Sequence, residues 1–140
     1  MKASVTPNLD DCNAALLVDG RITGLVLPVT LARECGFELV PNRSGHLLRD
    51  HEGRIWKARV MTDHLDFGSS NTKGTGRSPS VDKWIEGTQG LAGFIIADHH
   101  SPFNPELPIY PVPLAVVEQW RNGRPCVSLS RREILARLRV

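Results

Sequence analysis

The segment AGFIIA, residues 92–97, decides the fold that this sequence predicts. A continuous apolar run of this length is typical of a strand that is covered on both faces, so it predicts the centre of a β-sheet. Directly before it, VDKWIEG (81–87) predicts a short helix that the hydroxyl of Ser80 caps. A helix followed by such a strand indicates an α/β fold.

Short strands are also predicted upstream of this helix. FELV (37–40), GHLLR (45–49) and RIWKARVM (54–61) have the composition of strands, and a polar turn at 50–53 joins the last two as an antiparallel pair. The predicted fold class is therefore α/β, with a small mixed central sheet flanked by helices.

The N-terminal part allows two interpretations. An Asp-Gly pair between apolar segments predicts a β-hairpin over residues 14–27, because both turn positions favour a positive φ. Pro28 then opens a short helix that runs to Cys35 and ends at Gly36. The alternative is a helix that has already begun near Gly24.

The C-terminal part predicts one more extended segment and two helices. PIYPV (108–112) leads into a helix that begins with Pro113 and ends at Gly123. Ser130 opens a sequence with capping-box spacing, so a basic amphipathic helix is predicted at about 130–139.

Length and composition predict a single globular domain over residues 1–140. With 41% apolar and 23% charged residues, the chain is expected to fold around one packed core. No apolar run reaches the about 20 residues that a membrane-spanning helix needs. The three cysteines are widely spaced and odd in number, which argues against a disulfide framework. We therefore expect a cytoplasmic protein without a membrane partner.

Positive charge gathers towards the C-terminus. Residues 121–140 contain six arginines and one glutamate, a net charge of +5, whereas the whole chain carries +2. A basic segment on a mildly acidic body suggests a polyanionic partner, and nucleic acid, DNA or RNA, is the first expectation. The expected contacts are Arg121, Arg124, Arg131 and Arg132. A solvated helix face is the alternative explanation of the same charges.

A polar stretch at residues 68–80 predicts a mobile surface loop. It is rich in glycine, serine and threonine and has almost no apolar side chain. Lys73 and Arg77 lie within it, and these two cations together with backbone amides are suited to close over a phosphate. A simple linker is the alternative.

The order of the predicted elements resembles that of a known family. A helix ends at the Gly-aromatic pair Gly36-Phe37, strands contain KARVMT (57–62) and GFIIAD (93–98), and IYPVPLAVVEQW (109–120) follows. Over roughly residues 24–122 the chain thereby resembles the PD-(D/E)XK nuclease superfamily. The resemblance implies a restriction-endonuclease-like fold, in which two carboxylates bind Mg²⁺ or Mn²⁺ and a lysine orients or activates the attacking water.

The residues that this family uses for catalysis differ here. His46 stands where the first aspartate is expected, and Arg59-Val60-Met61 stands where the (D/E)xK tripeptide is expected. Arg59 supplies a positive charge in place of a metal ligand. The resemblance therefore implies either a catalytically silent domain or a displaced active site.

Two polar groups are candidates for a displaced site. Asp50, Glu52 and Lys57 bring two carboxylates and a lysine within eight residues, although exposed acids are also ordinary in a turn. Asp98 and His99 follow a predicted strand and are candidate metal ligands at the end of the sheet, where α/β folds often build sites; a structural role is the alternative.

Two classes of function are the main candidates, beside a third possibility of a small metal-containing hydrolase that uses Asp98, His99 and His100. The first is a nucleic-acid-binding domain of nuclease-like architecture, which would need Mg²⁺ or Mn²⁺ if it cleaves. The second is a protein-interaction module, such as an immunity or regulatory subunit, whose basic helix binds an acidic protein surface.

Overall fold

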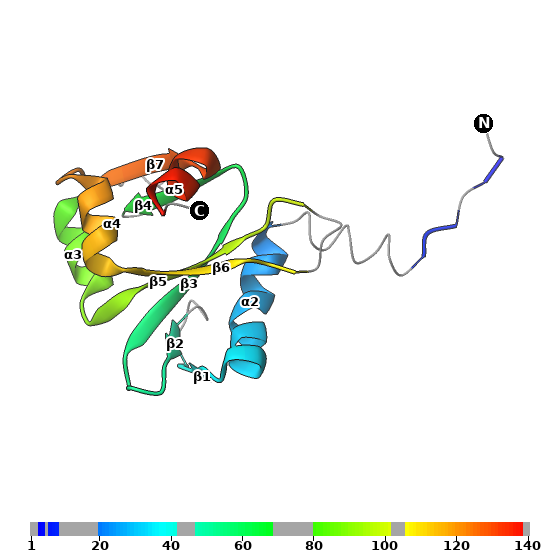
Figure 1. Cartoon of the computed structure of the whole chain (residues 1–140), viewed down its shortest axis with the longest axis horizontal. Helices are drawn as coiled ribbons and strands as arrows, with labels where there is room; N and C mark the ends of the chain where they lie inside the picture. Colours follow the sequence, from blue (N-terminus) through cyan, green and yellow to red (C-terminus); the bar gives the residue numbers. More distant parts are fainter. Residues whose placement is uncertain are drawn as a thin grey trace.

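The computed structural model describes residues 3–4, 6–8, 20–41, 47–68, 80–101 and 106–138. These residues form a mixed α/β fold with a larger and a smaller sheet (Figure 1). Their elements are α2 (Gly20–Cys35), β1 (Glu38–Leu39), β2 (Leu47–Arg49), β3 (Ile55–Met61), β4 (His64–Gly68), α3 (Val81–Thr88), β5 (Leu91–Asp98), β6 (Ile109–Pro113), α4 (Leu114–Arg121), β7 (Cys126–Ser130) and α5 (Arg131–Arg137). Among them, no helix has both the length and the apolar character to cross a membrane.

The larger sheet has five strands in the order β1-β2-β3-β5-β6. Strands β1, β2 and β3 form an antiparallel meander, β5 pairs with β3 in parallel, and β6 returns antiparallel to β5. The middle strand is β3, which corrects the prediction that residues 92–97 form the centre. The expected coverage of β5 on both faces is confirmed, because none of the side chains from Phe94 to Ala97 is more than 2% exposed.

Helix α2 covers one face of this sheet (Figure 1). Its residues Leu27 and Leu31 pack with Leu48, Trp56 and Ile95 in an apolar cluster. Each of these side chains is at most 9% exposed, so the contact between helix and sheet is a closed core.

The start of α2 differs from the first prediction. Residues from Gly20 onwards are helical, so the predicted hairpin over 14–27 is wrong for its described part, and Pro28 lies inside the helix. Burial of one helix face against the sheet outweighs the backbone hydrogen bond that a proline removes. The predicted end is confirmed, since the helix stops at Cys35 and Gly36 has a φ of 75°.

The opposite face of the sheet packs against α3, α4 and the smaller sheet. Phe94 and Ile96 of β5 meet Phe67, Trp84 and Trp120 there in the larger apolar cluster. Phe67 lies edge-on to Phe94 and to Trp120, with ring centroids 5.4 and 5.8 Å apart. The sheet is thus a middle layer between α2 and the α3–α4 side (Figure 1).

Two strands that the sequence did not predict form the smaller sheet. Strand β4 pairs antiparallel with β7, with His64 opposite Ser130 and Gly68 opposite Cys126. In each strand the buried residues alternate with exposed or half-buried ones, as expected where one face packs on a core.

The predicted helix caps are present. Ser80 and Ser130 each accept a hydrogen bond from the backbone amide three residues later, at 3.1 Å in both cases. The C-terminal helix predicted at about 130–139 begins directly after Ser130 and runs to Arg137. Pro113 is the N-cap of α4 rather than its first helical residue.

Candidate anion-binding site

Strand β3 carries two basic residues on one face of the sheet. Lys57 and Arg59 are two positions apart in a strand, so their side chains project to the same side. In the parallel register they lie beside Phe94 and Ile96 of β5, which face the α3–α4 side. The side chains of Lys57 and Arg59 therefore lie on the same face of the sheet as the apolar residues that pack against α3.

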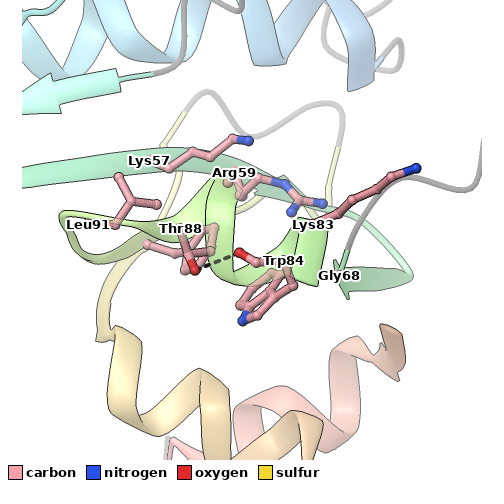
Figure 2. Close-up of a pocket in the computed structure, with 9 residues that line it drawn as sticks. Lys57, Arg59, Gly68, Lys83, Trp84, Thr88 and Leu91 are labelled. Carbon is pink, nitrogen blue, oxygen red and sulfur yellow. Dashed lines mark hydrogen bonds between the residues drawn. The ribbon is translucent and has the colours of Figure 1, made fainter. Parts of the chain in front are cut away.

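A pocket of about 180 Å³ lies between β3 and α3. Three cations line it, namely Lys57 and Arg59 from β3 and Lys83 from α3. Figure 2 shows Lys57 and Arg59 leaving the strand next to each other, with Lys83 extending from α3 on the same side. The rest of the lining comes from Gly68, Trp84, Gly87, Thr88, Leu91 and Phe94.

The cations of the pocket differ in their surroundings from other arginines of the protein. Within the described parts of the chain, no carboxylate forms an ion pair with Lys57, Arg59 or Lys83. Other arginines do have a carboxylate oxygen at 2.8 to 3.4 Å: Arg33, Arg49, Arg54, Arg121 and Arg131. The pocket therefore gathers three positive charges that have no direct ion-pair partner among the described residues, although the charge of Asp66 acts on Arg59 from a longer distance.

The protonation of the pocket reflects this crowding of charge. Burial lowers the pKa of the Lys57 ammonium, and the positive charge of Arg59 lowers it further. Burial likewise lowers the pKa of Arg59, against a smaller opposing effect of Asp66. An anion in the pocket would stabilise both charged forms, because it replaces lost hydration and offsets the mutual repulsion.

Trp84 is a fixed wall of the pocket. Its indole N–H donates to Oε1 of Glu118, and its ring stacks on Phe94 with centroids 5.9 Å apart. The guanidinium carbon of Arg121 lies 4.3 Å from the centre of the same ring. These contacts keep the indole in the core, so it is not placed to stack on a base.

The structure corrects the role expected for Arg121. This side chain is only 2% exposed, it pairs with Glu118 at 3.1 Å, and it donates to the carbonyl oxygen of Arg124. Because its guanidinium is bound inside the protein, Arg121 cannot present its charge to a nucleic acid.

Asp98 and Arg131 form a partly buried ion pair, in which the carboxylate is 5% and the guanidinium side chain 29% exposed. Nε and one terminal nitrogen of Arg131 donate to the two carboxylate oxygens of Asp98, at 2.9 and 2.8 Å. The oxygens that a metal ion would need are thus already bonded, and Arg131 is occupied as well. These bonds support the structural role that the sequence left open for Asp98, and the expected nucleic-acid contact of Arg131 stays a prediction for a guanidinium that is already paired.

His99 also lies in the core rather than at an open site. It is 5% exposed, its backbone N–H donates to the carbonyl of Met61 at 2.8 Å, and burial lowers the pKa of its imidazole despite the nearby charge of Asp98. Across the described ranges, no group of three or more histidine, cysteine, aspartate or glutamate side chains could share a metal ion.

The predicted trio of Asp50, Glu52 and Lys57 is not brought together. The Asp50 carboxylate accepts hydrogen bonds of 2.8 to 2.9 Å from two backbone amides of the turn, from Arg54 Nε and from Trp56 Nε1. Trp56 and Lys57 are consecutive strand residues and point to opposite faces, so Asp50 lies on the side away from Lys57. Asp50 therefore organises the turn between β2 and β3, and Glu52 is exposed.

The other predicted contacts divide into two groups. Arg124 and Arg132 are exposed and remain candidates for contact with a polyanion. Lys73 and Arg77 lie outside the described residues, as does His46, so their proposed roles stay predictions. Gly68, which directly precedes the segment 69–79, is part of the pocket lining.

The sequence alone does not indicate this pocket. The sequence suggests Lys57 as part of a displaced catalytic group with Asp50 and Glu52, and Arg59 as a residue that takes the place of a metal ligand, but it does not single out Lys83. The available signal was the Lys-x-Arg spacing inside a predicted strand, since two cations on one face of a half-buried strand require a partner or solvent.

Comparisons of the chain with protein-family models, with curated proteins and with solved structures found no match. The function is therefore inferred from the geometry of the site itself.

Proposed function

We propose that this protein binds nucleic acid without cleaving it, and that the pocket of Lys57, Arg59 and Lys83 contacts a phosphate. The observation that carries this proposal is the presence of three cations in the lining of one pocket, none of which forms an ion pair with a carboxylate among the residues that the structure describes. Lysine and arginine are the usual protein contacts of phosphate oxygens, and arginine can bind two oxygens at once.

The topology supports the nuclease-like part of the proposal. A helix, three antiparallel strands, a second helix and a strand parallel to β3 follow one another as the resemblance to the PD-(D/E)XK superfamily leads us to expect, with β4 inserted before α3. In that comparison Arg59 stands in place of a metal-binding acid. A guanidinium there repels a divalent cation and attracts a phosphate oxygen, which favours binding over hydrolysis.

We expect exposed cations outside the pocket to make further contacts with phosphates. Arg124 and Arg132 are exposed on the α4–β7 turn and on α5, whereas Arg121 and Arg131 are occupied internally. The expected binding surface is therefore smaller than the six arginines at the C-terminus suggest.

A protein-interaction module remains the second candidate, and one observation favours it. Val26 and Val29 are three residues apart on α2 and are 53% and 56% exposed. Apolar side chains that share the outer face of a helix are typical of a surface that binds another protein.

A titration with short duplex DNA, single-stranded DNA and RNA in EDTA, over a range of salt concentrations, tests the first candidate. For duplex DNA, log K should fall with log salt by about 0.9 per phosphate neutralised. The triple variant Lys57→Gln/Arg59→Gln/Lys83→Gln should bind more weakly and with a shallower slope. Arg33→Gln, on α2 across the sheet, removes one charge far from the pocket and should leave both quantities unchanged.

Two results would contradict the proposal. Absence of binding to all three nucleic acids at low salt would reject it and leave the protein-interaction module. Cleavage of any of them after addition of Mg²⁺ or Mn²⁺ would show a displaced active site and reject the non-catalytic part.

A further inference from the structure

We infer that the pocket of Lys57, Arg59 and Lys83 receives the terminal phosphate of a nucleic acid strand, a phosphate monoester, in preference to an internal phosphodiester. The inference rests on the proposed function and specifies the chemical group that the site recognises. Its support comes from the charge, the size and the walls of the pocket.

The charge of the pocket matches a monoester better than a diester. A phosphate monoester carries a charge of about −1.5 to −2 at neutral pH and offers three terminal oxygens, whereas a diester carries one negative charge and two such oxygens. The three cations that line the pocket supply enough positive charge, and enough N–H donors, for the two negative charges and three oxygens of a monoester. An internal phosphate would leave more of the positive charge without compensation.

The size of the pocket suits one phosphate group rather than a whole nucleotide. Its volume is about 180 Å³, whereas sites for complete small molecules occupy about 300–1,000 Å³. The sugar and base attached to the phosphate would therefore remain outside. A strand end meets this requirement, because only its terminal group has to enter.

The polar groups of the uncharged side chains in the walls already donate hydrogen bonds within the protein. Trp84 is held by Glu118, Arg121 and Phe94, and Leu91 presents only apolar atoms. The Thr88 hydroxyl donates to the carbonyl of Trp84 at 2.8 Å, as the dashed line in Figure 2 marks. Recognition in this pocket therefore depends on charge, and it should be independent of base sequence.

The test compares oligonucleotides of one sequence that carry a 5′-phosphate, a 3′-phosphate or hydroxyl groups at both ends. We expect at least one phosphorylated form to bind about ten-fold more tightly than the hydroxyl form, which is the factor that one charge-assisted hydrogen bond supplies. Lys57→Gln, Arg59→Gln and Lys83→Gln should each reduce this preference, and Arg33→Gln should preserve it. Lys83 is exposed on α3, so its variant tests the site without disturbing the core.

The possible outcomes separate the inference from the proposed function. Equal binding of all three oligonucleotides would overturn the inference and leave nucleic-acid binding intact, whereas absence of all binding would reject both. A preference that persists in all three pocket variants would place the end recognition elsewhere and also overturn the inference. A nucleoside monophosphate can also be used as a competitor. If it displaces the phosphorylated oligonucleotide as effectively as the unlabelled oligonucleotide does, the pocket binds phosphate monoesters, but its ligand is a free nucleotide and the assignment to strand ends is overturned.

Discussion

The carboxylate of Asp98 at the end of β5 accepts two hydrogen bonds from Arg131, the first residue of α5, which lies 33 residues later in the chain. Two backbone hydrogen bonds of 2.8 Å lie near this pair. The N–H of His99 donates to the carbonyl of Met61, and the N–H of Arg131 donates to the carbonyl of Asp63. The end of the larger sheet is thereby attached to the unit formed by β4, β7 and α5.

Loss of this side-chain pair should destabilise the protein. Asp98→Asn removes the charge from a carboxylate that is 5% exposed and leaves the Arg131 guanidinium without its partner. We expect the free energy of unfolding to fall by about 2–3 kcal/mol, as for other largely buried charged hydrogen bonds. Urea unfolding measures this change. Arg132→Gln removes an exposed charge next to the pair, and its free energy of unfolding should stay within about 0.5 kcal/mol of that of the wild type. An equal loss of stability in both variants would contradict a stabilising role of the Asp98–Arg131 pair.

The turn centred on Asp50 should make stability depend on pH in the acid range. Burial acts to raise the pKa of the Asp50 carboxyl, but hydrogen bonds from Trp56, Arg54 and backbone amides outweigh it and hold the pKa well below its usual range. Their stabilising effect is complete above the pKa of about 3.9 of an unfolded aspartate, and it is lost as the pH falls through the lower folded-state pKa.

Thermal unfolding of Asp50→Asn across this pH range provides the test. The variant should be less stable than the wild type at neutral pH, and the difference should narrow below about pH 4. Glu52→Gln is the matched control in the same turn, since its side chain is 71% exposed, and it should follow the wild type. Parallel curves for wild type and Asp50→Asn would contradict the role of the carboxylate.

Binding of a phosphorylated oligonucleotide should weaken at alkaline pH. The site needs the Lys57 ammonium, and burial together with Arg59 lowers the pKa of this group, so affinity should be constant at neutral pH and decline as the pH rises through that lowered pKa. In Lys57→Arg the charge persists to a pH of about 12, so affinity should hold further into the alkaline range. The test is to measure the dissociation constants of the wild type and of Lys57→Arg from neutral pH to about pH 10. If the affinity of both proteins falls in parallel, Lys57 is not the titrating group.

Gly93 is expected to tolerate no side chain. A Cβ at this position would lie 2.1 Å from the carbonyl oxygen of Val112 and 2.9 Å from Cα of Pro113. Both are backbone atoms of β6 and cannot move without disturbing its pairing with β5, so Gly93→Ala should cost at least about 2 kcal/mol of unfolding free energy. Gly24→Ala is the control, because no atom outside the adjacent backbone of its own helix lies within 4 Å of its Cβ, and it should stabilise α2 by about 0.5–1 kcal/mol. The free energies of unfolding of the two variants can be compared by denaturant unfolding.

Much of the fold could be predicted because its signals are local. Ser80 and Ser130 mark helix starts through hydrogen bonds to amides three residues away, and Gly36 ends α2 through its own backbone conformation. The apolar run of β5 needs no knowledge of its neighbours. These signals place α3, α5 and β5 within one or two residues of where the structure has them.

The parts that could not be predicted depend on distant partners. Strands β4 and β7 each bury only two side chains, too few to stand out in sequence, and they become strands by pairing with each other. Helix α2 contains a proline and begins at the glycine of an Asp-Gly dipeptide, which also favours hairpins, so its packing against the sheet decides its conformation. The burial of Arg121 likewise depends on Trp84, which is far away in the chain.

The pairing of β4 with β7 also has a consequence for the order of events on the ribosome. A nascent chain can form α2 and the larger sheet once residue 113 has emerged, but β4 then still has an open edge and uncovered apolar side chains. Gly68, one wall of the pocket, gains its partner Cys126 only when residues 126–130 have been synthesised. The protein therefore acquires its anion site late in its own production, and chains that terminate before β7 should be inactive in binding and prone to aggregate through β4.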